Sequence, residues 1–91
     1  MEPLALKRIT HKVPGGKLLR ISMDIEDGII KSIKITGDFF LYPEESIEDL
    51  EKSLQGATLE SVEEILNSKV EEIGIKMVGV SVKDIVGAIR S

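Results

Sequence analysis

Few residues in this 91-residue chain have side chains suited to catalysis. His11 is the single histidine, the side chain best suited to proton transfer near neutral pH, but no serine, cysteine or acid lies at an interpretable spacing from it. We therefore interpret His11 as a structural or surface residue. The chain has no cysteine, which excludes disulfides, thiolate metal sites and a cysteine nucleophile, and its single histidine excludes an all-histidine zinc site.

The segment Pro14-Gly15-Gly16-Lys17 is rich in glycine and ends in lysine, which invites comparison with a phosphate-binding loop. Such a loop reads GxxxxGK followed by Ser or Thr, between a strand and a helix, so that backbone N–H groups converge on the phosphate. Here the segment joins two predicted strands, and Leu18 stands where the hydroxyl residue is needed. We favour a plain hairpin turn. The alternative is that Lys12 and Lys17 flank an exposed tip that contacts a partner protein.

The 16 acidic residues are scattered along the chain. Most lie between residues 44 and 72, with a spacing typical of the solvated faces of helices. None forms a recognisable acid–base pair or the spacing of a metal-binding loop. We expect no catalytic, cofactor-binding or metal-binding residue in this chain.

The segment Gly37-Asp38-Phe39-Phe40 is the strongest candidate for an interaction site. Two adjacent aromatic residues cannot both point inward from an extended chain, because successive side chains of a strand point to opposite faces. One interpretation is that one ring enters the core while the other covers the start of a helix. The other is that one ring is exposed in a protein–protein interface.

A β-hairpin over residues 17–40 is expected to position these candidates. Apolar and polar residues alternate strictly over residues 19–26, which predicts one buried and one solvated face. In the second strand Ile29, Ile33 and Ile35 share one parity, and Lys31 is the exception.

The register of the hairpin depends on its turn. A two-residue Asp27-Gly28 turn would place Ile21 opposite Lys34 and split the apolar residues between two faces. We therefore predict a three-residue loop over residues 26–28, with Gly28 left-handed in a G1 bulge. The predicted pairs are Ile25 with Ile29, Ile21 with Ile33, and Leu19 with Ile35.

The flanking segments predict the remaining elements. Residues 8–13 form a strand antiparallel to the first hairpin strand, with Ile9 opposite Ile21 and His11 opposite Leu19. After residue 40 the apolar period changes from two to about 3.6, which is typical of helices. The expected helices run from Pro43 to a capping Gly56, from a cap at Thr58 or Ser61 through the apolar face Val62, Ile65, Leu66, Val70 and Ile73, and over residues 82–90 behind a capping box at Ser81 and Asp84. Residues 74–79 are expected to form a loop or a short extended piece.

These elements predict an α+β fold, in which a three-stranded antiparallel meander (β-β-β) is packed by about three helices in a two-layer sandwich. Ninety-one residues are expected to make a single domain, residues 1–91. The core is aliphatic, because the chain has one tyrosine, two phenylalanines and no tryptophan. The net charge of −4 argues against nucleic acid as the main partner. No membrane span or signal peptide is recognisable, so we expect a cytoplasmic protein.

Together these motifs resemble the accessory, C-terminal-type domain of lipoate–protein ligases, in the form that archaea encode as a separate small subunit beside a catalytic large subunit. The resemblance covers residues 7–56 closely and the last third loosely. Its features are the Gly15-Gly16 pair, the Asp27-Gly28-Ile29 turn, the Gly37-Asp38-Phe39-Phe40 segment, and the helix end Leu50-Glu51 with Leu54-Gln55-Gly56. Their order and spacing together are specific.

The resemblance implies a fold similar to that of the SufE and IscU iron–sulfur scaffold proteins. The cysteines that those scaffolds need are absent, so cluster or sulfur handling is disfavoured. It also implies a function in which a large subunit uses ATP with Mg to convert lipoate to lipoyl-AMP. The lipoyl group then passes to a lysine of an acceptor, either the E2 component of 2-oxoacid dehydrogenases or the glycine-cleavage H protein. The small chain is expected to bind no cofactor itself, to pair with the large subunit as a heterodimer, and to be needed for adenylation.

The residues expected to contact the large subunit are placed at two ends of the sheet. They are Lys12, Gly15, Gly16 and Lys17 at one end, and Asp38, Phe39 and Phe40 at the other. Two other functions compete with this one. The first is a non-catalytic interaction or scaffold module of the SufE/IscU-like fold without cluster chemistry. The second is a small nucleic-acid binder with Lys12 and Lys17 as a basic tip and the aromatic residues as a stacking platform.

Overall fold

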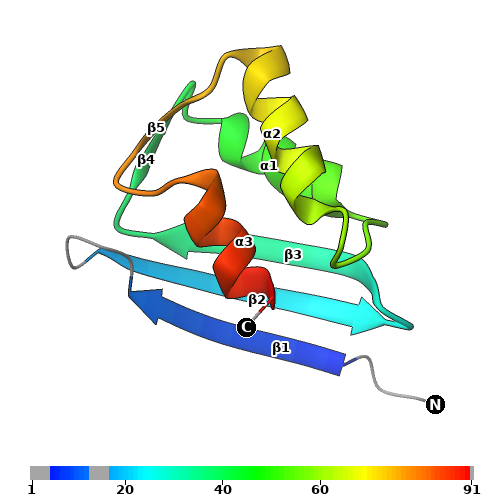
Figure 1. Cartoon of the computed structure of the whole chain (residues 1–91). Coiled ribbons are helices and arrows are strands. Elements are labelled where there is room, and N and C mark those ends of the chain that lie inside the picture. Colours follow the sequence, from blue (N-terminus) through cyan, green and yellow to red (C-terminus); the bar gives the residue numbers. More distant parts are fainter. Residues whose placement is uncertain (1–4, 13–16, 91) are drawn as a thin grey trace.

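Three antiparallel strands form the sheet, in the order in which they occur in the chain. The computed structural model describes residues 5–12 and 17–90 (Figure 1). Strands β1 (Ala5–Lys12), β2 (Leu18–Glu26) and β3 (Ile29–Gly37) are ordered β1-β2-β3. Ile9 lies opposite Ile21 and His11 opposite Leu19, so the predicted meander and its first register are confirmed.

The turn between β2 and β3 has two residues, and the three-residue loop predicted from the sequence is wrong. Asp27 and Gly28 both have positive φ, 54° and 76°, which suits a tight hairpin turn. Ile25 consequently pairs with Ile30. The apolar residues nevertheless stay on one face, because the register shifts by one residue beyond Ile25. Asp24 pairs with Ser32, and the pairs that follow are Met23 with Ile33, Ile21 with Ile35, and Leu19 with Gly37.

This shift is a β-bulge that takes up Lys31. An extra residue in one strand reverses the inward–outward alternation beyond it. Ile30 is fully buried before the bulge and Ile33 is buried after it, while Lys31 and Ser32 between them are exposed. Lys31, which interrupts the apolar alternation in the sequence, is therefore the extra residue of the bulge. After it, Ile33 and Ile35 again face the core.

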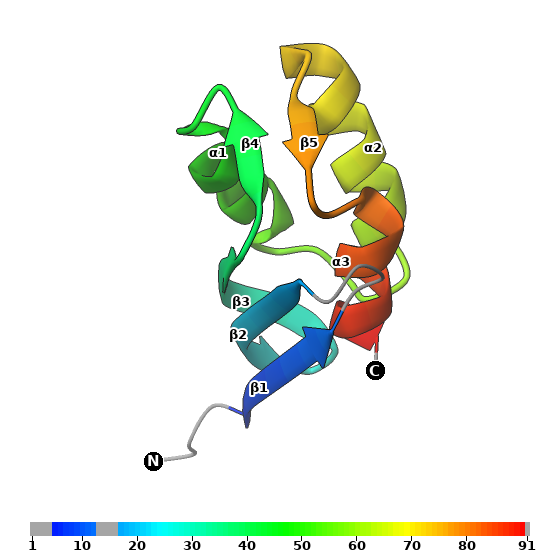
Figure 2. The ribbon, with the colours of Figure 1, turned by 90° about the vertical axis from the view of Figure 1, so that its left-hand side faces the viewer.

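Three helices lie on one side of the sheet. They are α1 (Ser46–Leu54), α2 (Val62–Ile73) and α3 (Val82–Arg90). Helix α1 contacts β3 and α2, and α3 contacts β1, β2 and α2. Figure 2 shows the sheet as one layer with all three helices on the same side. The predicted α+β arrangement of a three-stranded sheet under three helices is confirmed. None of the helices among the described residues is long and apolar enough to cross a membrane.

The core lies between these two layers and is aliphatic, as predicted. Inward-facing residues of β2 and β3 meet the apolar stripes of the helices. The fully buried large side chains are Leu19, Ile21, Met23, Ile30, Leu50, Leu54, Val62, Leu66, Ile85 and Ile89. Ile73 is 36% exposed, so the expectation that it faces the core is wrong.

The starts of α1 and α2 differ from the sequence prediction. Helix α1 begins at Ser46 rather than Pro43, because the Ser46 N–H and hydroxyl both donate to the Pro43 carbonyl and close a turn first. Ser61 stands at the N-cap of α2 without capping it, since its hydroxyl bonds Thr58 instead. The capping box of α3 is confirmed: Asp84 N–H donates to Ser81 Oγ (3.2 Å) and Ser81 N–H to Asp84 Oδ2 (2.9 Å).

The outer edge of β3 is covered by the chain that follows it. Ile35 N–H donates to Glu51 Oε2 of α1 at 2.7 Å. Gly56 N–H donates to Ile30 O (2.7 Å), and Ile30 N–H donates to Ala57 O (2.9 Å). Gly56 has a φ of 86° and follows Gln55, whose backbone is extended. Gly56 therefore turns the chain onto the edge of β3 and does not act as the helix cap that the sequence predicted. These bonds satisfy backbone groups that an edge strand otherwise leaves open.

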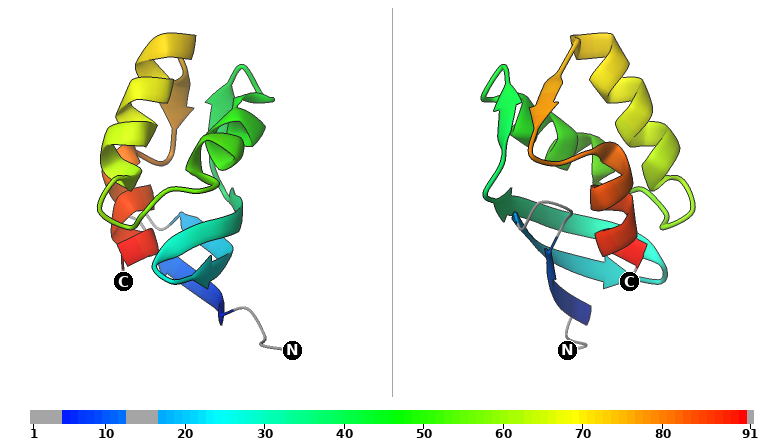
Figure 3. Two further views of the ribbon diagram at one scale, coloured as in Figure 1. Left: turned by 90° about the vertical axis from the view of Figure 1, so that its right-hand side faces the viewer. Right: turned by 60° about the vertical axis from the view of Figure 1, so that its left-hand side comes forward.

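A second, two-stranded sheet was not predicted. Strand β4 (Phe40–Tyr42) pairs antiparallel with β5 (Lys76–Val78), with Phe40 opposite Val78 and Tyr42 opposite Lys76. β5 is the short extended piece expected within residues 74–79. β4 rises from the end of β3 on the helix side of the three-stranded sheet (Figure 3). We call this pair the β4–β5 ribbon.

Candidate interaction site

The predicted contact residues that the structure describes meet at one end of the sheet, so their assignment to two opposite ends is wrong. Lys12 pairs with Leu18 at the end of β1, and Lys17 is the exposed residue just before β2. Asp38 N–H donates to Leu18 O at 3.0 Å. In a meander the end of the first strand, the start of the second and the end of the third lie at the same end of the sheet, so Lys12, Lys17 and Asp38 become neighbours. Gly15 and Gly16 lie outside the described residues.

Gly37 allows the close approach that holds this end together. A Cβ on Gly37 would stand 2.2 Å from Leu18 O and 2.7 Å from Cε2 of the Phe39 ring. Only glycine leaves space for the carbonyl of the neighbouring strand and for this ring. The chain thus turns out of the three-stranded sheet at Gly37 and starts the ribbon.

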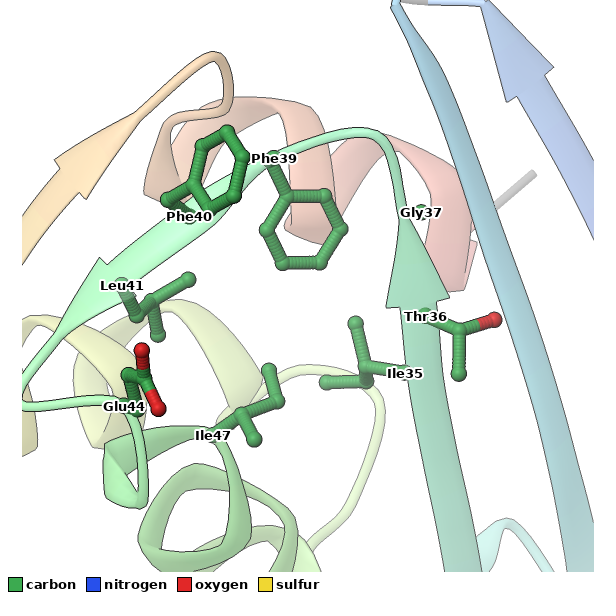
Figure 4. Close-up of a pocket in the computed structure, with 8 residues that line it drawn as sticks. All are labelled: Ile35, Thr36, Gly37, Phe39, Phe40, Leu41, Glu44 and Ile47. Atoms are coloured by element: carbon green, nitrogen blue, oxygen red, sulfur yellow. The ribbon is translucent and has the colours of Figure 1, made fainter.

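The two adjacent phenylalanines have different surroundings. Phe39 is half-buried, and its ring packs against the core and over Gly37 (Figure 4). Phe40 is 62% exposed. Phe40 is therefore the exposed ring that the second interpretation requires, while its place in a protein–protein interface stays a prediction.

Phe40 belongs to an exposed apolar face of the β4–β5 ribbon. Tyr42 has the same parity in β4, and Val78 lies directly opposite Phe40, so the three side chains share one face. Tyr42 is 52% and Val78 43% exposed. The opposite face carries Leu41 and Met77, which pack against the core. We call Phe40, Tyr42 and Val78 the ribbon face.

Sequence reasoning missed Tyr42 and Val78. Each ribbon strand has three residues, which is too short for a clear alternation, and the two strands are separated in sequence by α1 and α2. The available signal is a pair of short apolar runs, Phe40-Leu41-Tyr42 and Lys76-Met77-Val78. When they pair antiparallel, their central residues Leu41 and Met77 fall on one face and Phe40 and Val78 on the other.

An open hollow of about 320 Å³ adjoins the ribbon face where β3, β4 and α1 meet. Figure 4 shows the Phe39 ring between Gly37 and Ile47, above Ile35, while Glu44 lies toward α1. The residues around the hollow are Ile35, Thr36, Gly37, Phe39, Phe40, Leu41, Glu44 and Ile47. An exposed ring beside a mostly apolar hollow offers both a projection and a recess to a partner.

The residues considered for chemistry are not brought together. His11 is half-buried on β1, on the side of the sheet that the helices cover, opposite Leu19. Within the described residues, no group of three or more His, Asp and Glu side chains is arranged to hold a metal ion. What the arrangement offers is a contact surface.

Comparison with known proteins identifies the family. The family described as "Bacterial lipoate protein ligase C-terminus" matches residues 6–89. Lipoate-protein ligase A subunit 2 of Thermoplasma acidophilum is 37% identical over 73 residues, which cover 80% of this chain and 77% of that protein. A solved chain of the T. acidophilum bi-partite lipoate protein ligase, from an archaeal lipoylation system studied with its E2 lipoyl domain, has a TM-score of 0.87 and 31% identity. That match covers 98% of this chain and 99% of the solved one. This chain therefore belongs to the lipoate–protein ligase C-terminus family, as its motifs indicate.

Proposed function

We propose that this chain is the accessory subunit of a bipartite lipoate–protein ligase. The observation that carries the proposal is the match, over nearly the full length of both chains, to a subunit of the archaeal bipartite enzyme. The chain then acts with a catalytic large subunit in the ATP-dependent activation of lipoate to lipoyl-AMP and in the lipoylation of acceptor lysines. The acceptors are the E2 component of 2-oxoacid dehydrogenases and the glycine-cleavage H protein.

The division of labour in this proposal leaves the chemistry to the large subunit. ATP with Mg and lipoate bind there, and this chain contributes no catalytic residue and binds no cofactor. A cytoplasmic location is part of the same proposal.

The ribbon face is the surface that we assign to the large subunit. Exposed aromatic side chains that cluster on one face favour a protein contact, because their burial removes a large apolar area from water. The ribbon stands apart from the three-stranded sheet, and the hollow beside Phe40 has room for a side chain of the partner. Phe40 was expected to make this contact from the sequence, and Tyr42 and Val78 extend it.

Closure over the adenylation site explains why an accessory chain is needed. Lipoyl-AMP is a mixed anhydride, so water must be kept from it until the acceptor lysine arrives. A docked subunit can exclude that water, and it can order neighbouring loops of the large subunit in their active form.

The test is to measure lipoyl-AMP formation by the purified large subunit with and without this chain. We expect a rate increase of at least about tenfold on adding the chain, which corresponds to a population shift of roughly 1.4 kcal/mol. Equal rates would show that the chain is not an accessory subunit for adenylation. If adenylation is equal but the chain still co-purifies with the large subunit, a scaffold role is favoured instead.

A further inference from the structure

The two outer edges of the three-stranded sheet differ. The outer strands are β1 and β3. The edge of β3 is closed by Glu51, Gly56 and Ala57, which bond to its backbone groups. The edge of β1 has no such cover among the described residues, and Figure 1 shows no strand that extends the sheet beyond it. An open sheet edge is a template on which another chain can pair.

The register shows which way the backbone of β2 points. Asp38 N–H donates to Leu18 O, so the backbone groups of Leu18 point toward β3. These directions alternate along a strand of an antiparallel sheet, so the groups of Ile21 point toward β1. Ile35 supports the alternation, because it lies opposite Ile21 in β3 and its N–H points outward to Glu51.

The backbone of β1 consequently turns every second residue outward. Ile9 lies opposite Ile21 and exchanges hydrogen bonds with it. Arg8, Thr10 and Lys12 alternate with Ile9 in the strand, so their N–H and C=O groups point away from β2. Within residues 5–12 and 17–90, no hydrogen bond reaches these outward groups. We call the outward N–H and C=O groups of Arg8, Thr10 and Lys12 the open edge.

Strand β1 lacks most features that protect an edge strand. It has eight residues, no proline, and an unbroken register with β2. Short length, proline and bulges are common protections, and positive charge is another. Arg8 and Lys12 are exposed and share one face. A second copy of this chain, paired along the same edge, would add its own two cations to that face, and like charges on neighbouring strands are destabilising. The open edge therefore favours a different strand over a second copy.

The order of the chain in the family indicates which strand this is. The family described as the C-terminus of the bacterial ligase matches from residue 6, the second residue of β1. In those ligases the rest of the protein precedes the segment that corresponds to β1. Consecutive segments of a chain usually lie side by side, and an antiparallel neighbour needs only a short turn. In a ligase of two subunits, the corresponding preceding segment is the C-terminal end of the large subunit.

We propose that the C-terminal segment of the large subunit pairs antiparallel with β1 and becomes the fourth strand of the sheet. This inference rests on the proposed function and adds a second contact to the ribbon face. An extended segment of about five residues satisfies the backbone groups of the three outward residues. Every second side chain of that segment lies on the helix side, beside half-buried Ile9, so the segment alternates apolar and polar residues.

The two contacts do not overlap. The ribbon rises from the end of β3 on the helix side (Figure 3), whereas the open edge belongs to the outer strand on the other side of the sheet. Burial of the ribbon face contributes apolar contact, while backbone pairing fixes the direction and register of the added strand. Pairing at the open edge thus holds the end of the large subunit at the start of this domain, where one continuous chain runs in the ligases of a single chain.

Amide hydrogen exchange followed by NMR tests the pairing one residue at a time. In the free chain, we expect the N–H groups of Arg8, Thr10 and Lys12 to exchange fast and those of Ile9 and His11, which bond to β2, to exchange slowly. In the complex with the large subunit, the three outward N–H groups should exchange at least about tenfold more slowly. A large subunit without its last segment of about eight residues, the length of β1, should leave them fast while the ribbon face keeps the subunits associated.

Thr10→Pro tests the same contact by affinity. Proline removes one outward N–H and is tolerated in an edge strand where that group faces solvent, so the midpoint of urea denaturation should stay close to the wild-type value. The Kd for the large subunit should rise about tenfold, because a hydrogen bond is lost and the ring obstructs the added strand. Thr10→Val is the matched control: it keeps the N–H and the strand preference and should bind as the wild type does.

The results separate this inference from its alternatives. Equal exchange rates of the outward N–H groups in the free and the bound chain would overturn the proposal. So would protection that persists with the shortened large subunit, which would assign the edge to another strand, or protection that appears in the concentrated free chain, which would assign it to a second copy. If Thr10→Pro unfolds the chain, hydrogen exchange of the wild-type complex decides. A wild-type chain that neither binds the large subunit nor stimulates lipoyl-AMP formation would refute the proposed function instead.

Discussion

Removal of the Phe40 ring is the perturbation that tests the ribbon face most directly. Phe40 is 62% exposed and lies opposite Val78 at the centre of the face. An aromatic side chain has roughly 150–250 Å² to bury, so about 120 Å² of this ring is available to a partner. At about 25 cal/mol per Å², its complete burial in an interface contributes about 3 kcal/mol.

Phe40→Thr is the variant that separates binding from folding. Threonine keeps the preference for a β-strand, so β4 is retained and the free energy of unfolding changes by less than about 1 kcal/mol. Threonine recovers part of the lost contact, which leaves about 2 kcal/mol, or roughly a 30-fold increase in the Kd for the large subunit. Titration calorimetry gives the Kd, and urea denaturation of the free chain gives the stability.

Phe39→Ala is the matched control, because the neighbouring ring packs inward over Gly37 and against the core. Its loss should lower the free energy of unfolding by about 2 kcal/mol, less than for a fully buried ring, and the remaining folded chain should bind with a nearly normal Kd. The assignment of the ribbon face is refuted if Phe40→Thr destabilises the chain as much as Phe39→Ala does and leaves the Kd at its wild-type value.

Three further variants test the framework that holds the site. Gly37→Ala should lower the free energy of unfolding by about 1–3 kcal/mol, because its Cβ would stand 2.2 Å from Leu18 O. A wild-type stability in urea denaturation would contradict this close approach. Gly87→Ala should raise the stability by about 0.5–1 kcal/mol, since the position is helical, exposed and clear of contacts within 4 Å; a loss in thermal unfolding would show that the helix does not tolerate a side chain there. Glu51→Ala should lower the free energy of unfolding by about 1–2 kcal/mol, because it removes the acceptor of Ile35 N–H. Glu51→Gln keeps an acceptor oxygen and should recover part of that stability, so equal stabilities of the two variants would rule out the hydrogen bond as the cause.

The main sheet could be predicted from the sequence because its strands alternate over eight or nine residues. Burial of one parity fixes which residues face each other, so Ile9 and His11 have the partners expected for them. The hairpin register was mispredicted for a physical reason. The alternation of apolar residues alone cannot distinguish a three-residue loop from a two-residue turn followed by a bulge, because each arrangement adds one unpaired residue to the hairpin. The structure places that residue at Lys31, where an exposed charged side chain in an apolar strand was the available signal.

The ribbon face could not be predicted because it depends on contacts distant in sequence. Tyr42 and Val78 are 36 positions apart and become neighbours only when α1 and α2 fold back over the sheet. A three-residue strand has no periodicity of its own, and the apolar residues around it read equally well as a loop or a helix start. Phe40 was identified by a local argument, that two adjacent rings of an extended chain point to opposite sides. Such arguments find one residue of a surface and not its neighbours.

The apolar character of the ribbon face predicts how the complex of the two subunits responds to salt. Burial of Phe40, Tyr42 and Val78 removes apolar area from water, and added salt does not weaken such a contact. The Kd of the two subunits should therefore stay constant or fall slightly between about 0.1 M and about 1 M salt, whereas a contact made by charged side chains is screened within about 3 Å at 1 M. A Kd that rises steeply with salt in titration calorimetry would mean that charged residues, and not the ribbon face, carry the contact.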